Sequence, residues 1–201
     1  MIKYKVIDNF LNDSDFTELT KNILPKERAT CEHLNALSWL YVNKQVTPKW
    51  GKKDEQDRFK KVTDIERLNP IHDWLLSQLL QFGGYQSQAL QCLGPLLNKI
   101  EFLAPYRIQA NLTVQQEKRG RSQFHIDYKG EPLKHTSMIT SIFYLNTTNG
   151  PTILEDGTEI ECRANRLVSY PSNTYHAGVL CTDQPYRIVI NLNYFKEMEF
   201  S

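Results

Sequence analysis

The sequence predicts a mainly β protein of the α+β class, in which helices from the first half support a strand-rich second half. Two observations lead to this expectation. From Pro105 onward, eight short segments rich in β-branched and aromatic residues are separated by turn signals. Before that point, apolar residues recur at helical spacing in several stretches. With 201 residues the chain suits a single domain, with residues 1–104 as the helical support region and 105–195 as the core.

The N-terminal elements follow from capping signals. Residues 3–8 are expected to form a short strand. Asn12 stands where an N-cap should be and Asp15 follows three residues later, so a helix should begin there. We expect this helix to run to about Leu24, because Pro25 cannot continue it.

The stretch 26–65 has no clear assignment apart from a strand predicted at 37–42. The polar segment 43–62 follows, and it contains Trp50 and several lysines. Loops of this length are often functional. Two interpretations carry equal weight: a lid over a substrate site, or a solvated surface connection.

Two further helices are predicted before residue 105. In 70–81, apolar residues recur every three or four positions until Gly83-Gly84 interrupts the pattern. The stretch 86–100 shows the same spacing, with Gly94-Pro95 as the expected position of a kink.

The second half contains the strand segments. They are 106–114, 122–128, 136–146, 151–154, 158–162, 166–171, 176–180 and 186–195. Glu155-Asp156-Gly157 suits a tight hairpin whose central residues need positive φ. Antiparallel strands at this spacing fit a double-sheet jelly roll, a sandwich or a barrel, with the N-terminal helices packed on one sheet.

Composition excludes several classes of protein. The chain is 40% hydrophobic and 23% charged, and its net charge of +1 does not suggest the basic field of a dedicated nucleic-acid binder. Its four cysteines form no C-x-x-C pair, so reduced thiols are expected rather than a disulfide framework or zinc knot. The first ten residues lack the apolar core of a signal peptide, and no stretch approaches the ~20 apolar residues of a spanning helix. We therefore expect a cytoplasmic protein without a membrane partner.

A candidate metal site comes from histidine and aspartate spacing. In a strand, His125 and Asp127 would point to the same face. His176, just after a turn, is the candidate third ligand from another strand. Two histidines and one carboxylate on one side of a metal are typical of non-haem Fe(II) oxygenases, whereas a structural zinc normally has four protein ligands. The other three histidines are interpreted as surface or capping groups.

An open Fe(II) site needs a two-electron donor, commonly 2-oxoglutarate. The distal carboxylate of this co-substrate would lie inside the fold, where arginine is its best partner. Arg187 begins the last predicted strand, and Tyr144 could add a hydroxyl donor. If Arg187 faces inward, alternation places Val189, Asn191 and Asn193 on the same face.

Five segments, in this order, resemble the Fe(II)/2-oxoglutarate-dependent dioxygenases, in particular the prolyl 4-hydroxylase-like branch: FHIDY, SIFYLN, NGPTIL, NRLVSYPSNTYHAG and YRIVINLNYF. The resemblance covers residues 105–195, with weaker support from the opening YKVIDNFLNDSDF. It implies a double-stranded β-helix (jelly roll) core. It also implies that three residues bind Fe(II): His125, Asp127 and His176. Five residues are expected to bind the co-substrate: Arg187, Tyr144, Asn111, Thr140 and Ile142.

The sequence departs from the family pattern at a few positions. Thr113 stands where the family often has tyrosine, and Asn149 and Asn165 replace glycines. Asparagine tolerates left-handed backbone conformations, so both replacements are physically reasonable. The spacing from the third metal ligand to Arg187 is about one residue longer than usual. Since strands have a period of two, Arg187 would turn outward unless the loop at 181–185 absorbs the extra residue.

The activity implied by the resemblance is hydroxylation of a C–H bond, coupled to decarboxylation of 2-oxoglutarate to succinate and CO₂, with O₂ as oxidant and ascorbate as a candidate reductant. No separate acid or base is needed. Peptidyl proline is the substrate expected at family level, and a free amino acid or another small metabolite is the alternative. A nucleic-acid demethylase and a non-catalytic jelly-roll binding module are the remaining interpretations.

Overall fold

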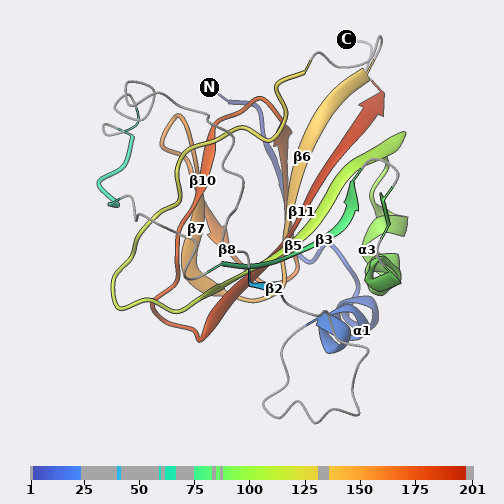
Figure 1. Ribbon diagram of the computed structural model, residues 1–201, viewed down its shortest axis with the longest axis horizontal. Helices are drawn as coiled ribbons and strands as arrows, with labels where there is room; N and C mark the ends of the chain where they lie inside the picture. Colours follow the sequence, from blue (N-terminus) through green and yellow to red (C-terminus); the bar gives the residue numbers. More distant parts are fainter. Residues whose placement is uncertain are drawn as a thin grey trace.

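The computed structural model describes residues 2–23, 40–41, 59, 62–66, 75–82, 85–86, 88–130 and 136–197. Two antiparallel sheets pack face to face, and the helices α1 and α3 lie on the outer side of the larger sheet (Figure 1). This arrangement confirms the predicted mainly β jelly roll with N-terminal helices packed on one sheet. In the described part of the chain, no helix is long and apolar enough to cross a membrane.

The larger sheet has eight strands, in an order that brings the two halves of the chain together. That order is β1 (Lys5–Ile7), β9 (Arg166–Pro171), β6 (Thr136–Tyr144), β11 (Tyr186–Glu197), β5 (Ala104–Val114), β3 (Leu75–Phe82) and β2 (Leu40–Tyr41), with β4 (Tyr85–Gln86) paired to β3. The smaller sheet has the order β10 (His176–Gly178), β7 (Thr148–Leu154) and β8 (Glu159–Cys162). Seven of the eight strand segments predicted after residue 105 are therefore strands.

Two predictions of secondary structure are wrong. The predicted helix at 70–81 is contradicted because Leu75–Phe82 is strand β3, paired with β5 and β2, while 70–74 lie outside the described residues. Two leucines, two polar residues and two leucines fit a helix, but they also fit a strand covered on both faces, and pairing with β5 decides between them. The segment 122–128 is a loop with one isolated bridge, at His125, rather than a strand.

The helices follow their capping and breaking signals. Helix α1 spans Asp13–Ile23, and the side chain of Asn12 accepts a hydrogen bond from the Asp15 N–H at 2.9 Å. The helical stretch predicted at 86–100 is divided into the 3₁₀ helix η3 (Gln88–Leu93) and α3 (Gly94–Lys99). Proline is accepted in the first turn of α3 but not in a helix interior, which explains the division at this point.

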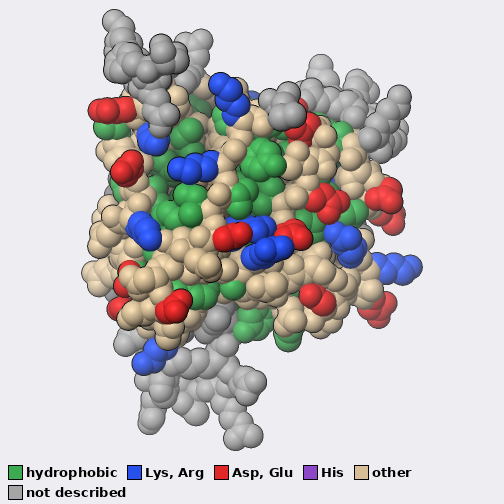
Figure 2. Space-filling model, turned by 180° about the vertical axis from the view of Figure 1, so that it is seen from behind, with side chains coloured by type: hydrophobic (Ala, Val, Ile, Leu, Met, Phe, Trp, Pro, Cys, Tyr) green, Lys and Arg blue, Asp and Glu red, His purple; other side chains and the backbone are tan. Residues whose placement is uncertain are grey.

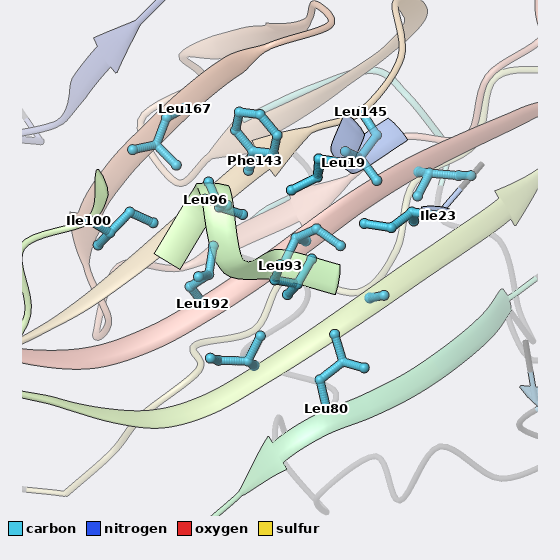
Figure 3. Close-up of a cluster of buried hydrophobic side chains, with 14 of the residues drawn as sticks. Leu19, Ile23, Leu80, Leu93, Leu96, Ile100, Phe143, Leu145, Leu167 and Leu192 are labelled. Carbon is cyan, nitrogen blue, oxygen red and sulfur yellow. The ribbon is translucent and has the colours of Figure 1, made fainter. Parts of the chain in front are cut away.

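The outer core lies between these helices and the larger sheet. Leu19 and Ile23 of α1 and Leu96 of α3 are fully buried against strand residues that include Phe143 and Leu192 (Figure 3). Each such side chain contributes about 1.5–3 kcal/mol through burial. Because this layer is almost entirely apolar, it supports the sheet from behind and leaves the other face for polar groups.

In each of two turns, one residue has the positive φ that was expected there. Gly157 has a φ of 87° in the β7–β8 hairpin, where its N–H donates to the Leu154 carbonyl at 3.0 Å. Asn165 has a φ of 61°, and its amide exchanges two hydrogen bonds of 2.8 Å with the backbone of Leu11. Asn149, in contrast, lies within β7. The asparagine before β9 therefore adopts the left-handed turn and also attaches the N-terminal segment.

Candidate metal and co-substrate site

The segment that carries His125 and Asp127 is held by backbone bonds to β10 and to the residue that follows β9. His125 and His176 form an antiparallel bridge in which each N–H donates to the other's carbonyl, at 3.0 and 2.9 Å. The Ser122 N–H donates to the Gly178 carbonyl at 2.8 Å, and the Asp127 N–H to the Ser172 carbonyl at 3.2 Å. The two ligands thus share a face because this bridge aligns the loop with β10, and not because they alternate along a strand.

The side chains of His125, Asp127 and His176 converge. One donor atom of each residue lies within 4.8 Å of the others, and this is the one such cluster of ligand-type residues in the described ranges. The Asp127 carboxylate oxygens lie 4.0 Å from His125 Nε2 and 3.7 Å from His176 Nε2. Two imidazoles and one carboxylate directed at one point form the donor set that suits an open Fe(II) site.

A backbone carbonyl orients each of the two imidazoles. Nδ1 of His125 lies 3.0 Å from the Gln123 carbonyl, and Nδ1 of His176 lies 3.1 Å from the Thr174 carbonyl. A carbonyl can only accept, so each Nδ1 carries the proton and each Nε2 presents its lone pair to the shared point. Burial, with the neighbouring His125 ring, lowers the pKa of His176 to about 4. His176 is therefore neutral near pH 7, as a metal ligand must be.

The Asp127 carboxylate accepts hydrogen bonds on both oxygens. Oδ1 accepts from Arg107 Nη2 at 2.6 Å, and Oδ2 accepts from Thr140 Oγ1 at 3.0 Å and from Asn193 Nδ2 at 3.1 Å. Burial raises the pKa of this carboxyl, but the facing His176 and the Arg107 guanidinium outweigh burial and hold the pKa far below its ordinary value. Asp127 is thus ionised and fixed in orientation.

Arg187 lies at the other end of the same inner face and is buried. Its Nε donates to the Gly150 carbonyl at 2.8 Å and its Nη2 to Thr152 Oγ1 at 3.1 Å, while its guanidinium lies 5.5 Å from the centre of the Tyr144 ring. These partners are all neutral. No carboxylate pairs with Arg187 among the described residues. The loop before β11 therefore absorbs the longer spacing, and Arg187 faces inward.

Tyr144 and Thr152 complete this end of the face. The Tyr144 hydroxyl donates to Thr152 Oγ1 at 2.8 Å. Burial raises the pKa of Tyr144 to about 12, so this hydroxyl keeps its proton. Because Thr152 Oγ1 accepts from both Tyr144 and Arg187, its own proton remains available to donate to a ligand. We refer to Arg187, Tyr144 and Thr152 as the arginine end, and to the three metal-ligand candidates as the metal end.

The other predicted residues take varied places. The Thr140 hydroxyl contacts Asp127 and Ser172, so Thr140 belongs to the metal end rather than to the arginine end. Ile142 packs in the apolar cluster between the sheets. Asn111 lies on β5 opposite Val189 and accepts a hydrogen bond from Gln109 Nε2 at 3.1 Å.

Sequence reasoning did not single out Arg107 or Thr152. Arg107 lies twenty residues before Asp127, and its contact with Asp127 depends on the β5–β11 register, in which Arg107 lies opposite Asn193. Thr152 lies inside the NGPTIL segment, and its place in this family-like segment was the one sequence feature that could have indicated a role. Neither residue type is unusual enough on a strand to indicate a site without the fold.

Three buried polar atoms on the strands of the larger sheet have no hydrogen-bond partner among the described residues: Thr113 Oγ1, Tyr170 Oη and Asn191 Oδ1. Thr113 lies opposite Arg187 in the sheet, and the Tyr170 ring lies 5.2 Å from the His176 ring. Such atoms cost free energy unless a ligand or water satisfies them. Their presence near both ends fits a polar molecule bound along this face.

Comparison with known protein families and with curated protein sequences finds no match. Solved structures do match. A prolyl hydroxylase from Trichoplax adhaerens, in complex with a hypoxia-inducible-factor peptide fragment, superimposes with a TM-score of 0.55 at 16% identity, covering 96% of this chain and 83% of that chain. The non-haem α-ketoglutarate-dependent carbocyclase SnoK, from nogalamycin biosynthesis, gives a TM-score of 0.56 at 14% identity, covering 97% and 80%.

A third structure, the α-ketoglutarate-dependent epimerase SnoN from the same biosynthesis, gives a TM-score of 0.54 at 11% identity, covering 98% of this chain and 78% of that chain. Identities this low establish a common fold and not a common reaction. The resemblance inferred from the sequence motifs is confirmed at this level. The chain therefore has the double-stranded β-helix fold of the non-haem 2-oxoglutarate-dependent oxygenases.

Proposed function

We propose that this protein is an Fe(II)- and 2-oxoglutarate-dependent dioxygenase that hydroxylates a C–H bond of its substrate. The observation that carries the proposal is that a two-histidine, one-carboxylate cluster shares an inner face with a buried arginine that has no carboxylate partner among the described residues. When bound, iron and 2-oxoglutarate with O₂ supply the oxidising chemistry, with succinate and CO₂ as the co-products. The chain contributes binding, orientation and exclusion of water.

The metal end would hold the iron through His125, Asp127 and His176. Three protein ligands on one side leave positions for the co-substrate and O₂. The hydrogen bonds from Arg107, Thr140 and Asn193 hold the Asp127 carboxylate in place, since outer partners of this kind orient a ligand before the metal binds.

The arginine end would bind the distal carboxylate of 2-oxoglutarate. A buried guanidinium that donates only to neutral oxygens is costly unless an anion accompanies it. Arg187 supplies charge and a planar set of donors, and the hydroxyls of Thr152 and Tyr144 lie beside it. This cluster supports a dicarboxylate co-substrate rather than a neutral one.

The test is formation of succinate from 2-oxoglutarate by the iron-loaded protein in air. We expect succinate formation even without the prime substrate, through uncoupled turnover. Asp127→Ala should abolish it, whereas Asp13→Asn, which changes an exposed aspartate of α1, should not. If the folded, iron-loaded wild-type protein forms no more succinate than Asp127→Ala, the proposal is overturned. The same assay excludes or supports the non-catalytic binding module.

The net charge of +1 does not favour the alternative of a nucleic-acid demethylase, because binding to a nucleic-acid backbone uses a continuous basic surface. On the face of the molecule in Figure 2, basic and acidic side chains are interspersed.

A further inference from the structure

Arg107 and His125 form the exposed edge of the metal end. The side chain of Arg107 is 27% exposed and that of His125 is 45% exposed, whereas Asp127 and His176 are 2% and 3% exposed. A molecule that approaches the metal ligands from solvent therefore meets the guanidinium of Arg107 and the imidazole of His125.

The Arg107 guanidinium is fixed and still has donors to offer. Its Nε donates to Asn193 Oδ1 at 2.9 Å, and its Nη2 donates to Asp127 Oδ1 at 2.6 Å. A guanidinium has five N–H donors, so three of them, including both on Nη1, have no hydrogen-bond partner in the described part of the chain. Because the group is already held in place, binding a planar anion would cost little further side-chain entropy.

The charges of the loaded site favour an anion at this edge. The positive charges are those of a divalent metal, Arg187 and Arg107, and the negative charges are those of Asp127 and the 2-oxoglutarate dianion. His125 and His176 would bind the metal as neutral imidazoles and add no charge. One positive charge remains on the set as a whole, and Arg107 is its exposed cationic side chain. A single carboxylate balances that charge better than a doubly charged phosphate does.

Aromatic side chains flank the same edge. Tyr106 precedes Arg107 and Tyr128 follows Asp127, and their rings meet edge to face at 5.2 Å. Phe195 packs against both rings, at 6.4 and 6.2 Å. These half-buried rings form an apolar cluster next to Arg107 and Asp127 in the chain, and such a cluster suits a compound with a hydrocarbon body and one carboxylate.

We propose that the prime substrate is a small carboxylic acid, such as a free amino acid, whose carboxylate binds Arg107 while its C–H bond faces the metal end. This inference rests on the proposed function. The alternative, the interior of a peptide chain, would present to Arg107 a neutral carbonyl in place of the anion.

The test uses acetate as the probe and acetamide as its neutral counterpart. Wild-type protein loaded with Zn(II), which is redox-inert, and with 2-oxoglutarate is titrated at constant ionic strength. The Nε–H resonance of Arg107, assigned by its absence in Arg107→Lys, is followed by NMR. We expect acetate to shift this resonance in a saturable way. Acetamide should bind at least about tenfold more weakly than acetate, as expected for the loss of a hydrogen bond to a charged group. Arg119→Gln, which changes an exposed arginine, should leave the acetate shift unchanged.

Equal effects of acetate and acetamide, or no shift with either, would overturn the inference. Succinate formation without an acetate shift would overturn this inference and leave the proposed function in place. An acetate shift in a protein that forms no succinate would overturn the proposed function and the substrate role together. In the turnover assay, free L-amino acids should stimulate succinate formation more than their amides, and equal stimulation by amides or blocked peptides would contradict the substrate class.

Discussion

The two ends of the inner face are built differently. At the arginine end, all three side chains come from paired strands and are buried: Tyr144 from β6, Thr152 from β7 and Arg187 from β11. At the metal end, His176 begins the short strand β10, while His125 and Asp127 lie on a loop. The first end is positioned by continuous sheet hydrogen bonding, and the second by a small number of particular contacts.

This difference indicates how each end should respond to change. A strand residue at the arginine end can be replaced with little effect on the surrounding backbone, because the sheet maintains it. The metal end depends on the His125–His176 bridge and on the partners of Asp127, so a change there should spread to the other ligands. Ligand residues on a loop near solvent also suit a site that must admit substrate.

The largest expected effect is that of Asp127→Ala. It removes the one charged ligand, so we expect metal affinity to fall at least about 100-fold, since even the loss of a partner behind a ligand costs 10–100-fold. Titration with Co(II), followed by its absorption spectrum, measures this affinity. Asp13→Asn is the matched control. Wild-type affinity in Asp127→Ala would show that the three-residue cluster is not the metal site.

The second effect tests the separation of the two ends. Arg187→Met should weaken 2-oxoglutarate binding to the Mn(II)-loaded protein by about 100-fold, because the buried carboxylate loses its charged partner. Arg187→Lys keeps the charge but loses the planar fork, so about tenfold weakening is expected. Calorimetry measures both, with Arg119→Gln as the control. Metal affinity should stay within about twofold of wild type, and an equal loss there would contradict the independence of the two ends.

Sequence patterns predicted the strands of the second half because alternation and turn residues are local signals. They failed at 70–81, where the apolar pattern is compatible with a helix but residues 75–82 form a strand because they pair with β5. His125 and Asp127 were selected on the assumption of a strand, but a bridge to β10 aligns them. Arg107 was missed because its contact with Asp127 depends on the register between β5 and β11. A single sequence does not show which residues of two strands are paired.

The third effect is a pH dependence that distinguishes the metal end from the arginine end. The pKa of His176 is lowered from 6.5 to about 4 by burial, so between these values the unfolded chain binds more protons than the folded one. The free energy of unfolding should therefore fall as the pH falls through this window, by on the order of 3 kcal/mol in total. Tyr144 of the arginine end has a pKa of about 12, so it does not titrate in this pH window.

Urea denaturation of the metal-free protein at about pH 7 and about pH 5 measures this change, with His176→Gln as the comparison. The variant should lose most of the difference in stability between the two conditions. Equal stability of the wild-type protein at both pH values would contradict burial of a neutral His176.

The smallest expected effect concerns the support behind the metal end. The Phe59 ring stacks on Phe124 at 4.4 Å and packs against Tyr175 at 5.2 Å, and these two residues directly precede His125 and His176. One buried ring therefore contacts both ligand-bearing segments. Phe59→Leu keeps most of the apolar volume, so it should cost only about 1 kcal/mol of stability. It should also weaken Co(II) binding a few-fold, because both histidines lose part of their support.

Phe143→Leu is the matched control, since Phe143 is equally buried and packs against Phe10 and Phe16 in the outer core. Thermal unfolding should show similar destabilisation of the two variants, and only Phe59→Leu should alter Co(II) affinity. If both variants weaken metal binding equally, general stability and not the aromatic support would govern the site. If only Phe59→Leu weakens it, the metal end depends on a contact from outside the sheets, which the arginine end does not need.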